Sequence, residues 1–233
     1  MARKFQFGIG EFYHIYTRGN DRKQIFLNDR DYLRFLLLMY LCNSVKPIHI
    51  SNQAYSNLEE LFKIPRQAPL VSIGAYCFMP NHVHLVIKEI KEKGVSTFMQ
   101  KLSTAYSMYF NKKYVKTGSL FEHPFKAKHV DNDEYFRYLF AYVHLNPVKI
   151  NDPDGWQGKR ILYPETAKQF LDYYRYSSYS FYTGRKRVED VILNKEVFPE
   201  YFSLPADFES FMSDWINFDN EEFVEHNASS SGC

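Results

Sequence analysis

Alternating hydrophobic and polar positions predict a set of β-strands in the first part of the chain. Residues 11–18 alternate and are rich in aromatic and β-branched side chains, and the turn residues at 19–21 end this run. A second apolar run covers residues 70–78, and a Met-Pro-Asn turn at 79–81 leads into a third run at 82–87. We expect the second and third strands to form an antiparallel hairpin.

A helical period marks the segments between and after these strands. It predicts helices over residues 29–45, 94–114 and 133–146, a short helix at 57–62, and a further helix at 164–174. A last strand is expected at 125–130. Asn28 is the expected cap of the first helix, and residues 131–134 supply a cap and an acidic first turn for the third.

The order β-α-β-β-α-β followed by a helix is typical of the ferredoxin-like fold. We therefore predict an α+β protein with an antiparallel sheet, helices on one face of that sheet, and a helical C-terminal extension. Residues 1–150 are expected to form the main domain, within which the proline-rich stretch 47–69 is an insertion or a long connection.

The distribution of charged residues divides the chain into a basic part and an acidic part. Residues 1–187 carry 28 Lys and Arg against 16 Asp and Glu, whereas residues 188–233 carry 1 against 11. We expect residues 151–187 to be a basic extension of the domain and 188–233 an acidic tail with a disordered end. This asymmetry favours a body that binds a polyanion, although a basic face can also be merely solvated.

Composition also bears on the compartment and on the kind of ligand. The three cysteines form no CxxC pair and leave one unpaired, which argues for a reducing compartment. The chain opens without a signal peptide and its longest apolar run, residues 35–42, is too short to span a bilayer, so we expect a cytoplasmic protein that does not bind membranes.

Aromatic residues make up 18% of the chain; most must be core, but exposed rings can stack on unpaired bases.

The third strand begins with two histidines one residue apart. Because side chains alternate along a strand, His82 and His84 share one face while Val83 and Leu85 point to the other. Two imidazoles side by side on a rigid strand suit a divalent metal ion. The alternative is that both are simply polar residues on the solvated face of a sheet.

A second candidate group lies on the helix that ends near Pro147. Tyr142 and Asn146 are four residues apart and therefore share a face, and proline disfavours helical geometry at the preceding Asn146, which places its amide at the helix end. Packed over His82 and His84, this face would add an amide oxygen to a divalent metal site and place a phenol one turn away. Bound Mg²⁺ or Mn²⁺ could then orient a phosphoryl group for attack by the tyrosine.

Purely structural roles remain open for Tyr142 and for the nearby histidines. Tyr142 stands among several aromatic residues and could be one more core ring. His144 is offset by two positions from Tyr142, so it is expected to pack elsewhere or to support the site indirectly. His14 is a polar outlier on the first strand, and is either a support for the site or an ordinary sheet histidine with its hydrogen bonds satisfied.

Several short runs together resemble a known family. The chain resembles the single-tyrosine HUH transposases, and among them the REP-associated tyrosine transposase-like group, in the runs YHIYTRGN (13–20), YCFMPNHVHL (76–85), YFNKKY (109–114), TGSLF (117–121) and YVHLNPVK (142–149), with a weaker match at YSSY (176–179). The resemblance covers roughly residues 11–187 and implies the HUH endonuclease fold.

The resemblance implies specific roles for four residues. His82 and His84 would be the metal pair, Asn146 the third ligand, and Tyr142 the nucleophile that becomes joined to a 5′ phosphate and leaves a free 3′ hydroxyl. The expected cofactor is Mg²⁺ or Mn²⁺, and the expected partner is single-stranded or hairpin-bearing DNA, bound by a monomer or a homodimer. One departure is that His-Pro (123–124) stands where the family usually carries Gly-Arg, so Lys126 or Lys128 would replace a phosphate-binding arginine.

Basic and amide side chains supply candidate DNA contacts, whose phosphate interactions would give a salt-dependent affinity without reading sequence. The candidates are Arg18, Asn20, Arg22, Lys23, Lys101, Lys112, Lys113, Lys116, Lys126, Lys128, Arg185, Lys186 and Arg187. We expect fewer than half of them to touch DNA.

Three functions are compatible with these features. The first is a metal-dependent single-stranded DNA endonuclease and strand-transferase, that is, a transposase that nicks and rejoins DNA through a phosphotyrosine intermediate. The second is a non-catalytic protein of the same fold that binds hairpin DNA. The third is a hydrolase that uses metal-activated water. Because Tyr142 lies one helical turn before Asn146, we favour the first over the third.

Overall fold

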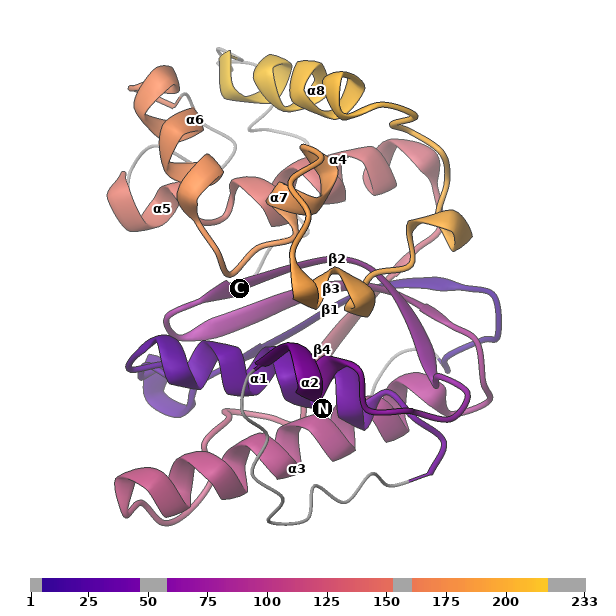
Figure 1. The fold of residues 1–233 in the computed structure, drawn as a ribbon, viewed down its shortest axis with the longest axis vertical. Coiled ribbons are helices and arrows are strands. Elements are labelled where there is room, and N and C mark those ends of the chain that lie inside the picture. The colour runs from indigo at the N-terminus through magenta and orange to yellow at the C-terminus, as the bar shows by residue number, and fades with distance from the viewer. Residues whose placement is uncertain (1–5, 47–57, 153–160, 218–233) are drawn as a thin grey trace.

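The fold is built on a four-stranded antiparallel sheet. The structure, a computed structural model, describes residues 6–46, 58–152 and 161–217. Its strands are β1 (Phe12–Arg18), β2 (Val71–Met79), β3 (His82–Glu89) and β4 (Lys126–Val130), in the spatial order β2-β3-β1-β4 (Figure 1). This is the order of the ferredoxin-like fold, so the α+β prediction is confirmed.

Two long helices cover one face of the sheet. They are α1 (Asp29–Cys42) and α3 (Gly94–Tyr114), and the short α2 (Leu58–Phe62) lies beside α1 (Figure 1). The core beneath them includes Ile15, Phe78, Val83, Leu85 and Ile87, which are all fully buried. On β1 and β3 these positions alternate with side chains such as His14, His82 and His84, so the period of two sends the two sets to opposite faces of the sheet.

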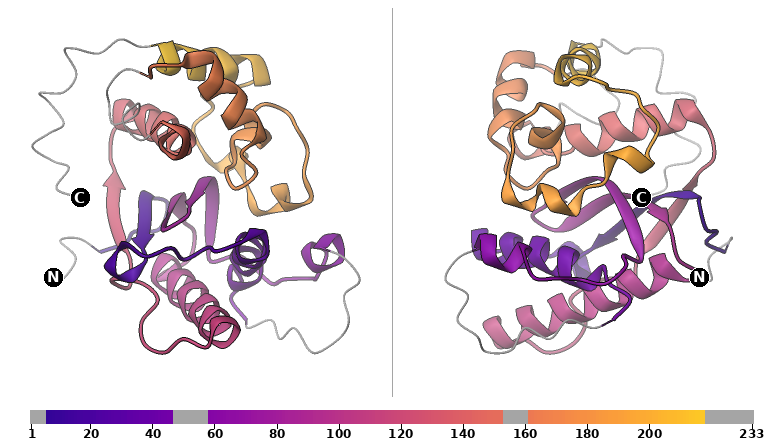
Figure 2. Two further views of the ribbon diagram at one scale, coloured as in Figure 1. Left: turned by 90° about the vertical axis from the view of Figure 1, so that its left-hand side faces the viewer. Right: turned by 45° about the vertical axis from the view of Figure 1, so that its right-hand side comes forward.

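The opposite face of the sheet is covered by the later part of the chain. The covering elements are α4 (Asp133–Leu145), α5 (Val148–Asn151), α6 (Pro164–Tyr173), α7 (Tyr179–Tyr182) and α8 (Pro205–Asn217). Figure 2 shows the sheet as the middle layer between these elements and the α1 and α3 layer. Cys77 and Val86 of the sheet pack into this second core together with Leu139 and Phe140 of α4. The expectation of helices on one face alone is therefore wrong, because α4 and α5 together with the C-terminal extension form a second layer on the other face.

Part of the C-terminal extension also pairs with the edge of the sheet. The backbone N–H of Phe78 donates to the carbonyl of Tyr176 at 2.9 Å, and the N–H of Ser178 donates to the carbonyl of Tyr76 at 3.0 Å. A sequence period could not place this segment, because three residues are too short to show one. Here they shield an edge strand that would otherwise expose unpaired backbone groups.

The part of the acidic segment that the structure describes is folded. It forms the 3₁₀ helices η2 (Val188–Ile192) and η3 (Lys195–Val197) as well as α8. Phe198 lies against the β-bulge at Gly74, where an added Cβ would come within 2.6 Å of the Phe198 ring. Phe208 and Met212 of α8 are fully buried in the second core. The division of the chain into a domain, a basic extension and an acidic tail stays a prediction.

Element boundaries differ from expectation in a few places. The first long helix ends at Cys42 rather than at 45, and β4 begins at Lys126 rather than at 125. Asn28 precedes α1 but its side chain makes no capping hydrogen bond; its amide instead donates to the Tyr114 hydroxyl at 2.8 Å. Asn132 does cap α4, accepting from the Tyr135 N–H at 2.7 Å. Expectations for 47–57, 153–160 and 218–233 lie outside the described residues.

Among the residues that the structure describes, no helix has the length and apolar character needed to cross a lipid bilayer.

Candidate active site

The two histidines of β3 lie on the sheet face beneath α4. They alternate with Val83 and Leu85, which are buried in the core on the other face. His84 is buried, with 5% of its surface exposed, and His82 is half-buried. Their ring centroids are 4.9 Å apart and their planes are perpendicular. Two imidazoles therefore stand side by side at one end of the sheet.

Helix α4 brings Tyr142 and Asn146 to these histidines. The Tyr142 ring lies edge-on to His84, with centroids 5.3 Å apart. The Asn146 side-chain N–H donates to the Tyr142 carbonyl at 3.1 Å, which fixes the amide one turn beyond the phenol. Both residues thus lie over the sheet face that carries His82 and His84.

Asn146 lies at the end of α4, as expected, but Pro147 does not remove it from helical geometry. Asn146 has φ −51° and ψ −39°, inside the right-handed helical region, and its N–H still donates to the Tyr142 carbonyl at 3.1 Å. Pro147 is itself helical, with φ −60° and ψ −24°. The preference of pre-proline residues for extended geometry is overridden here because α5 follows at once and continues the turn.

Asn81 holds the ring of His82. The Asn81 Oδ1 atom lies 2.7 Å from His82 Nδ1, which assigns the ring proton to Nδ1 and leaves Nε2 with its lone pair. Burial, followed by the charges of Arg18 and Lys149, lowers the pKa of His82 to about 4, while the Asn146 amide acts in the opposite direction. The imidazole is therefore neutral, the form in which histidine binds metals.

His14 of β1 lies directly behind His84. Its Nε2 atom is 2.9 Å from His84 Nδ1. Burial, followed by the charge of Lys128, lowers the pKa of His14 to about 3, and burial also places the pKa of His84 well below its ordinary value. His14 was expected either to support the site or to be an ordinary sheet histidine. In the structure it contacts a residue of the candidate site, His84.

Two buried polar atoms at this site have no hydrogen-bond partner within the described part of the chain. They are His84 Nε2 and Asn146 Oδ1. Buried polar atoms are nearly always paired. One of these atoms is on the His84 ring, which contacts Tyr142, and the other is on the amide one helical turn beyond Tyr142, so both are available to a ligand. Imidazole nitrogens with an amide oxygen are a suitable donor set for a divalent cation. No cluster of three His, Cys, Asp or Glu side chains with metal-binding geometry occurs in the described residues, so any such site here depends on the amide.

Positive charges surround the site. On the same sheet face, Arg18 pairs with His82 in the register of β1 and β3, and Lys126 pairs with Tyr16 in that of β1 and β4. The Lys126 ammonium lies 5.9 Å from the Tyr16 ring centroid, and the exposed Lys128 lies 3.9 Å from that of Tyr135. This face therefore combines basic and aromatic side chains beside the histidines.

The remaining candidate DNA contacts are spread over other surfaces. Asn20 and Arg22 are the first and last residues of the 3₁₀ helix η1 (Asn20–Arg22), directly after β1, and Lys23 follows. Lys101, Lys112 and Lys113 lie on α3, with Lys116 just beyond it, on the side of the sheet away from the histidines. Arg185, Lys186 and Arg187 lie between α7 and η2.

Several of these basic side chains have structural partners. Lys101 donates to the Ser44 carbonyl at 2.7 Å, and Lys113 donates to the buried Asp31 carboxylate at 2.6 Å. Arg185 pairs with Asp172, and Arg187 donates to the Arg175 carbonyl. The structure does not bring the thirteen candidates together on one surface.

His144 faces away from the site. Its Nδ1 donates to the Phe140 carbonyl at 2.8 Å, which leaves Nε2 to accept from the Ser178 hydroxyl at 2.8 Å. Ser178 also accepts from the Tyr76 N–H at 3.0 Å. The contact therefore ties α4 to the segment that pairs with β2, which is a packing role.

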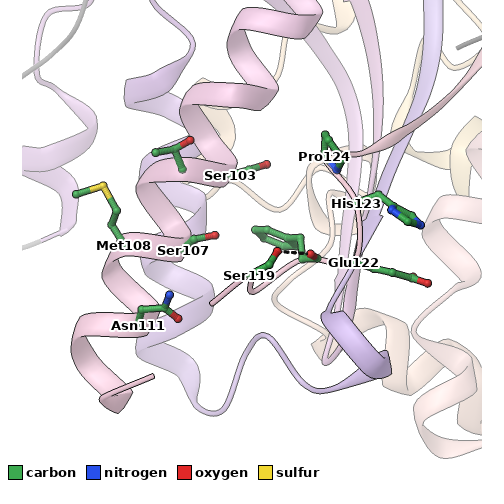
Figure 3. Close-up of a pocket in the computed structure, with 10 residues that line it drawn as sticks. Ser103, Ser107, Met108, Asn111, Ser119, Glu122, His123 and Pro124 are labelled. Carbon is green, nitrogen blue, oxygen red and sulfur yellow. Dashed lines mark hydrogen bonds between the residues drawn. The ribbon is translucent and has the colours of Figure 1, made fainter. Parts of the chain in front are cut away.

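A separate groove lies between α3 and the loop before β4 (Figure 3). It has a volume of about 480 Å³ and is lined by hydroxyl and amide side chains, Ser103, Thr104, Ser107, Asn111 and Ser119, together with apolar ones such as Met108 and Phe121. None of the candidate metal ligands, nor Tyr142, lines it. Ser119 uses its hydroxyl locally, donating to the Phe121 carbonyl at 2.6 Å (Figure 3).

Comparison with known proteins identifies the family. A search of curated proteins gives no match. Among solved structures, the chain is similar to a REP-associated tyrosine transposase bound to a REP hairpin, with 13% sequence identity, a TM-score of 0.46, and coverage of 81% of this chain and 89% of the other. Residues 12–146, more than half of the 233 residues, match the family model described as IS200-like transposase. The chain therefore belongs to the IS200-like transposase family.

Proposed function

We propose that this protein is a divalent-metal-dependent endonuclease and strand-transferase that acts on hairpin-bearing single-stranded DNA, with Tyr142 as its nucleophile. The observation that carries the proposal is the pair of unpartnered buried atoms, His84 Nε2 and Asn146 Oδ1, close to the Tyr142 ring. Membership of a transposase family supports DNA as the substrate.

In the proposed reaction, the Tyr142 hydroxyl oxygen attacks a phosphodiester phosphorus. The bond from phosphorus to the 3′ oxygen breaks as the bond to the tyrosine oxygen forms. The tyrosine proton is released to solvent, and the departing 3′ oxygen takes up a proton from solvent. The product is a 5′ phosphotyrosine with a free 3′ hydroxyl, and attack by a 3′ hydroxyl on that linkage rejoins a strand. The phosphotyrosine keeps the energy of the broken bond, so rejoining needs no external energy source.

His82, His84 and Asn146 would hold Mg²⁺ or Mn²⁺. The bound cation would polarise a phosphoryl oxygen and orient the phosphate. The protein's own contribution is to keep both imidazoles neutral by burial and to fix their rings through Asn81 and His14. Such supporting contacts increase metal affinity because they hold the ligands in the binding geometry.

Arg18, Lys126 and Lys128 are the DNA contacts that the geometry favours. They share the sheet face of the histidines, and their register places them across β1 and β4 from the site. Tyr16 and Tyr135, each beside one of these lysines, could stack on unpaired bases. The lysines of α3 lie on the other side of the sheet, so DNA that reached both groups would have to wrap around the β4 edge.

The test is a denaturing gel of the full chain with a labelled hairpin-bearing oligonucleotide and Mn²⁺. We expect a band at the mass of protein plus DNA, which Tyr142→Phe and His82→Ala both lose. Tyr138→Phe is the matched control, since Tyr138 lies one turn earlier on α4 with its ring centroid 6.0 Å from that of Tyr142.

Two other results would contradict the proposal. Cleaved DNA that persists in Tyr142→Phe would indicate hydrolysis by metal-activated water. DNA binding without a covalent band, across several hairpins and metals, would indicate a non-catalytic hairpin-binding protein.

A further inference from the structure

The catalytic face of α4 continues past Pro147. The chain passes from α4 into α5 through Asn146 and Pro147, which both have helical backbone angles. The Lys149 N–H donates to the Asn146 carbonyl three residues earlier at 3.2 Å, and the Asn146 N–H donates to the Tyr142 carbonyl four residues earlier at 3.1 Å. Positions i, i+4 and i+7 of a helix share a face. Tyr142, Asn146 and Lys149 therefore form one stripe.

The ammonium group of Lys149 is held close to the candidate site. Its Nζ atom lies 5.6 Å from the Tyr142 ring centroid. Its charge also contributes to lowering the pKa values of both His82 and His84, which places it within electrostatic reach of the two imidazoles. The side chain is half-buried, so it is more restricted than a surface lysine.

The neighbouring cations lie differently with respect to the tyrosine. Arg18 acts on the same two histidines from the neighbouring strand β1, where it pairs with His82. Lys126 and Lys128 lie over the rings of Tyr16 and Tyr135, toward the β4 edge. Lys149 is thus the cation that lies on the same helical stripe as Tyr142 and Asn146.

We propose that Lys149 is a further catalytic residue, whose ammonium contacts a non-bridging oxygen of the phosphate that Tyr142 attacks. The inference rests on the proposed function. Attack by the phenol oxygen increases negative charge on the non-bridging oxygens, and a cation already in place stabilises that charge without reorganisation. Lys149 keeps its proton throughout, so the proton balance of the reaction is unchanged. Removal of one such preorganised donor typically costs about 100-fold to 1,000-fold in rate.

The experiment measures single-turnover formation of the covalent adduct by the full chain with Mn²⁺, at protein concentrations that saturate the hairpin oligonucleotide. The variants are Lys149→Met, Lys149→Arg and, as a matched control, Lys168→Met, which removes an exposed lysine from α6 that is not among the candidate DNA contacts. DNA affinity is measured separately in a Tyr142→Phe background, and the thermal midpoint is recorded for each variant.

We expect Lys149→Met to slow adduct formation about 100-fold. We also expect less than about a fivefold change in DNA affinity, because one phosphate contact among several contributes little to binding. Lys149→Arg should recover most of the rate, since it restores the charge. Lys168→Met should match the wild type.

Three results would overturn the inference. They are an unchanged rate in Lys149→Met, a loss that a lowered thermal midpoint or a weakened affinity fully explains, and an equal loss in Lys149→Arg. If the proposed function is wrong, the wild type itself forms no adduct. That pattern differs from the three above, and it also rules out the inference.

Discussion

The Nε2 atom of His14 lies 2.9 Å from Nδ1 of His84, and this contact joins strand β1 to a proposed metal ligand on β3. If His84 Nε2 binds the cation through its lone pair, the His84 proton resides on Nδ1 and is donated to His14. His14 then determines both the tautomer and the ring orientation of His84. Asn81 has the corresponding relationship to His82.

We predict that His14→Phe weakens metal binding. The phenyl ring keeps most of the buried volume but cannot accept a hydrogen bond, so the His84 ring loses its orienting partner. Loss of such a partner typically reduces metal affinity by about 10-fold to 100-fold. Titration of the purified protein with Mn²⁺ in a calorimeter measures the change.

His129→Phe is the control for this substitution, because His129 lies on β4 and contacts Glu11 rather than the candidate ligands. A wild-type Mn²⁺ affinity in His14→Phe would show that His14 does not support the site. A loss as large in His129→Phe would point to a general effect on the sheet.

The sequence predicts the local parts of this site because they depend on short periods. The shared face of His82 and His84 follows from two-residue alternation, and that of Tyr142 and Asn146 from a single helical turn. The contact between His14 and His84 depends instead on the register of two strands about 70 residues apart. Such a register is set by the packing of the whole sheet, so a one-residue shift would have turned His14 to the other face.

The dependence on contacts between distant segments also explains where the structure differs from the other sequence predictions. The pre-proline rule correctly places Asn146 at a helix end, but it is a local preference, and the following α5 overrides it. Recognition of that continuity would have added Lys149 to the stripe. The pairing of residues 176–178 with β2 joins segments about 100 residues apart, and no period in so short a segment could indicate it.

We predict that Lys126 and Lys128 contribute to DNA binding more than the exposed lysines of α3. Replacing both with alanine removes two cations from the site face. Each phosphate contact to single-stranded DNA contributes about 0.7 to the slope of log affinity against log salt, so the slope should fall by about 1.4. Fluorescence anisotropy in a Tyr142→Phe background, at several salt concentrations, measures it.

The matched control for the double substitution is Lys112→Ala with Lys116→Ala, which removes two exposed lysines at the end of α3. This pair should leave the slope close to that of the wild type. An equal decrease in both double variants would show that DNA contacts both sides of the sheet.

We predict that Ser178→Ala destabilises the protein and loosens α4. The Ser178 hydroxyl bonds to His144 Nε2 at 2.8 Å and accepts from the Tyr76 N–H at 3.0 Å, and all three groups are buried. Leaving a buried polar group unpaired costs about 1 to 3 kcal/mol, so the free energy of unfolding should fall by that amount. Urea denaturation measures it.

Ser177→Ala is the comparison for this variant. Its hydroxyl accepts only a longer, local hydrogen bond from the Tyr179 N–H at 3.2 Å among the contacts described, so a smaller loss is expected. An equal decrease in the free energy of unfolding in the two variants would mean that the hydrogen bond to His144 does not add to stability. Hydrogen exchange of α4 amides should increase in Ser178→Ala alone.

We predict that the ion pair between Asp31 and Lys113 makes stability depend on pH. The Asp31 side chain is fully buried, and it joins α1 to α3 by accepting hydrogen bonds from the Lys113 ammonium at 2.6 Å, the Tyr114 hydroxyl at 2.7 Å and the Tyr109 hydroxyl at 2.9 Å. Burial alone would raise the pKa of Asp31, but these bonds and that from the Leu27 N–H together hold it below 3.8. Because the folded pKa is the lower one, the contribution is present above the unfolded pKa and is lost as the pH falls through the folded value.

Asp31→Asn should therefore lower the free energy of unfolding at neutral pH by about 2 to 4 kcal/mol, since it leaves the Lys113 charge without its partner. The difference from the wild type should begin to shrink as the pH falls below about 4, where the Asp31 carboxyl of the unfolded wild type becomes protonated, and should continue to shrink down to the lower folded pKa. Asp21→Asn is the control, because the pair between Asp21 and Lys23 is exposed on both sides and should contribute less than about 1 kcal/mol. Urea denaturation from pH 3 to 8 would contradict the prediction if the Asp31→Asn difference did not vary with pH, because a loss independent of pH would come from packing and not from the charge of this pair.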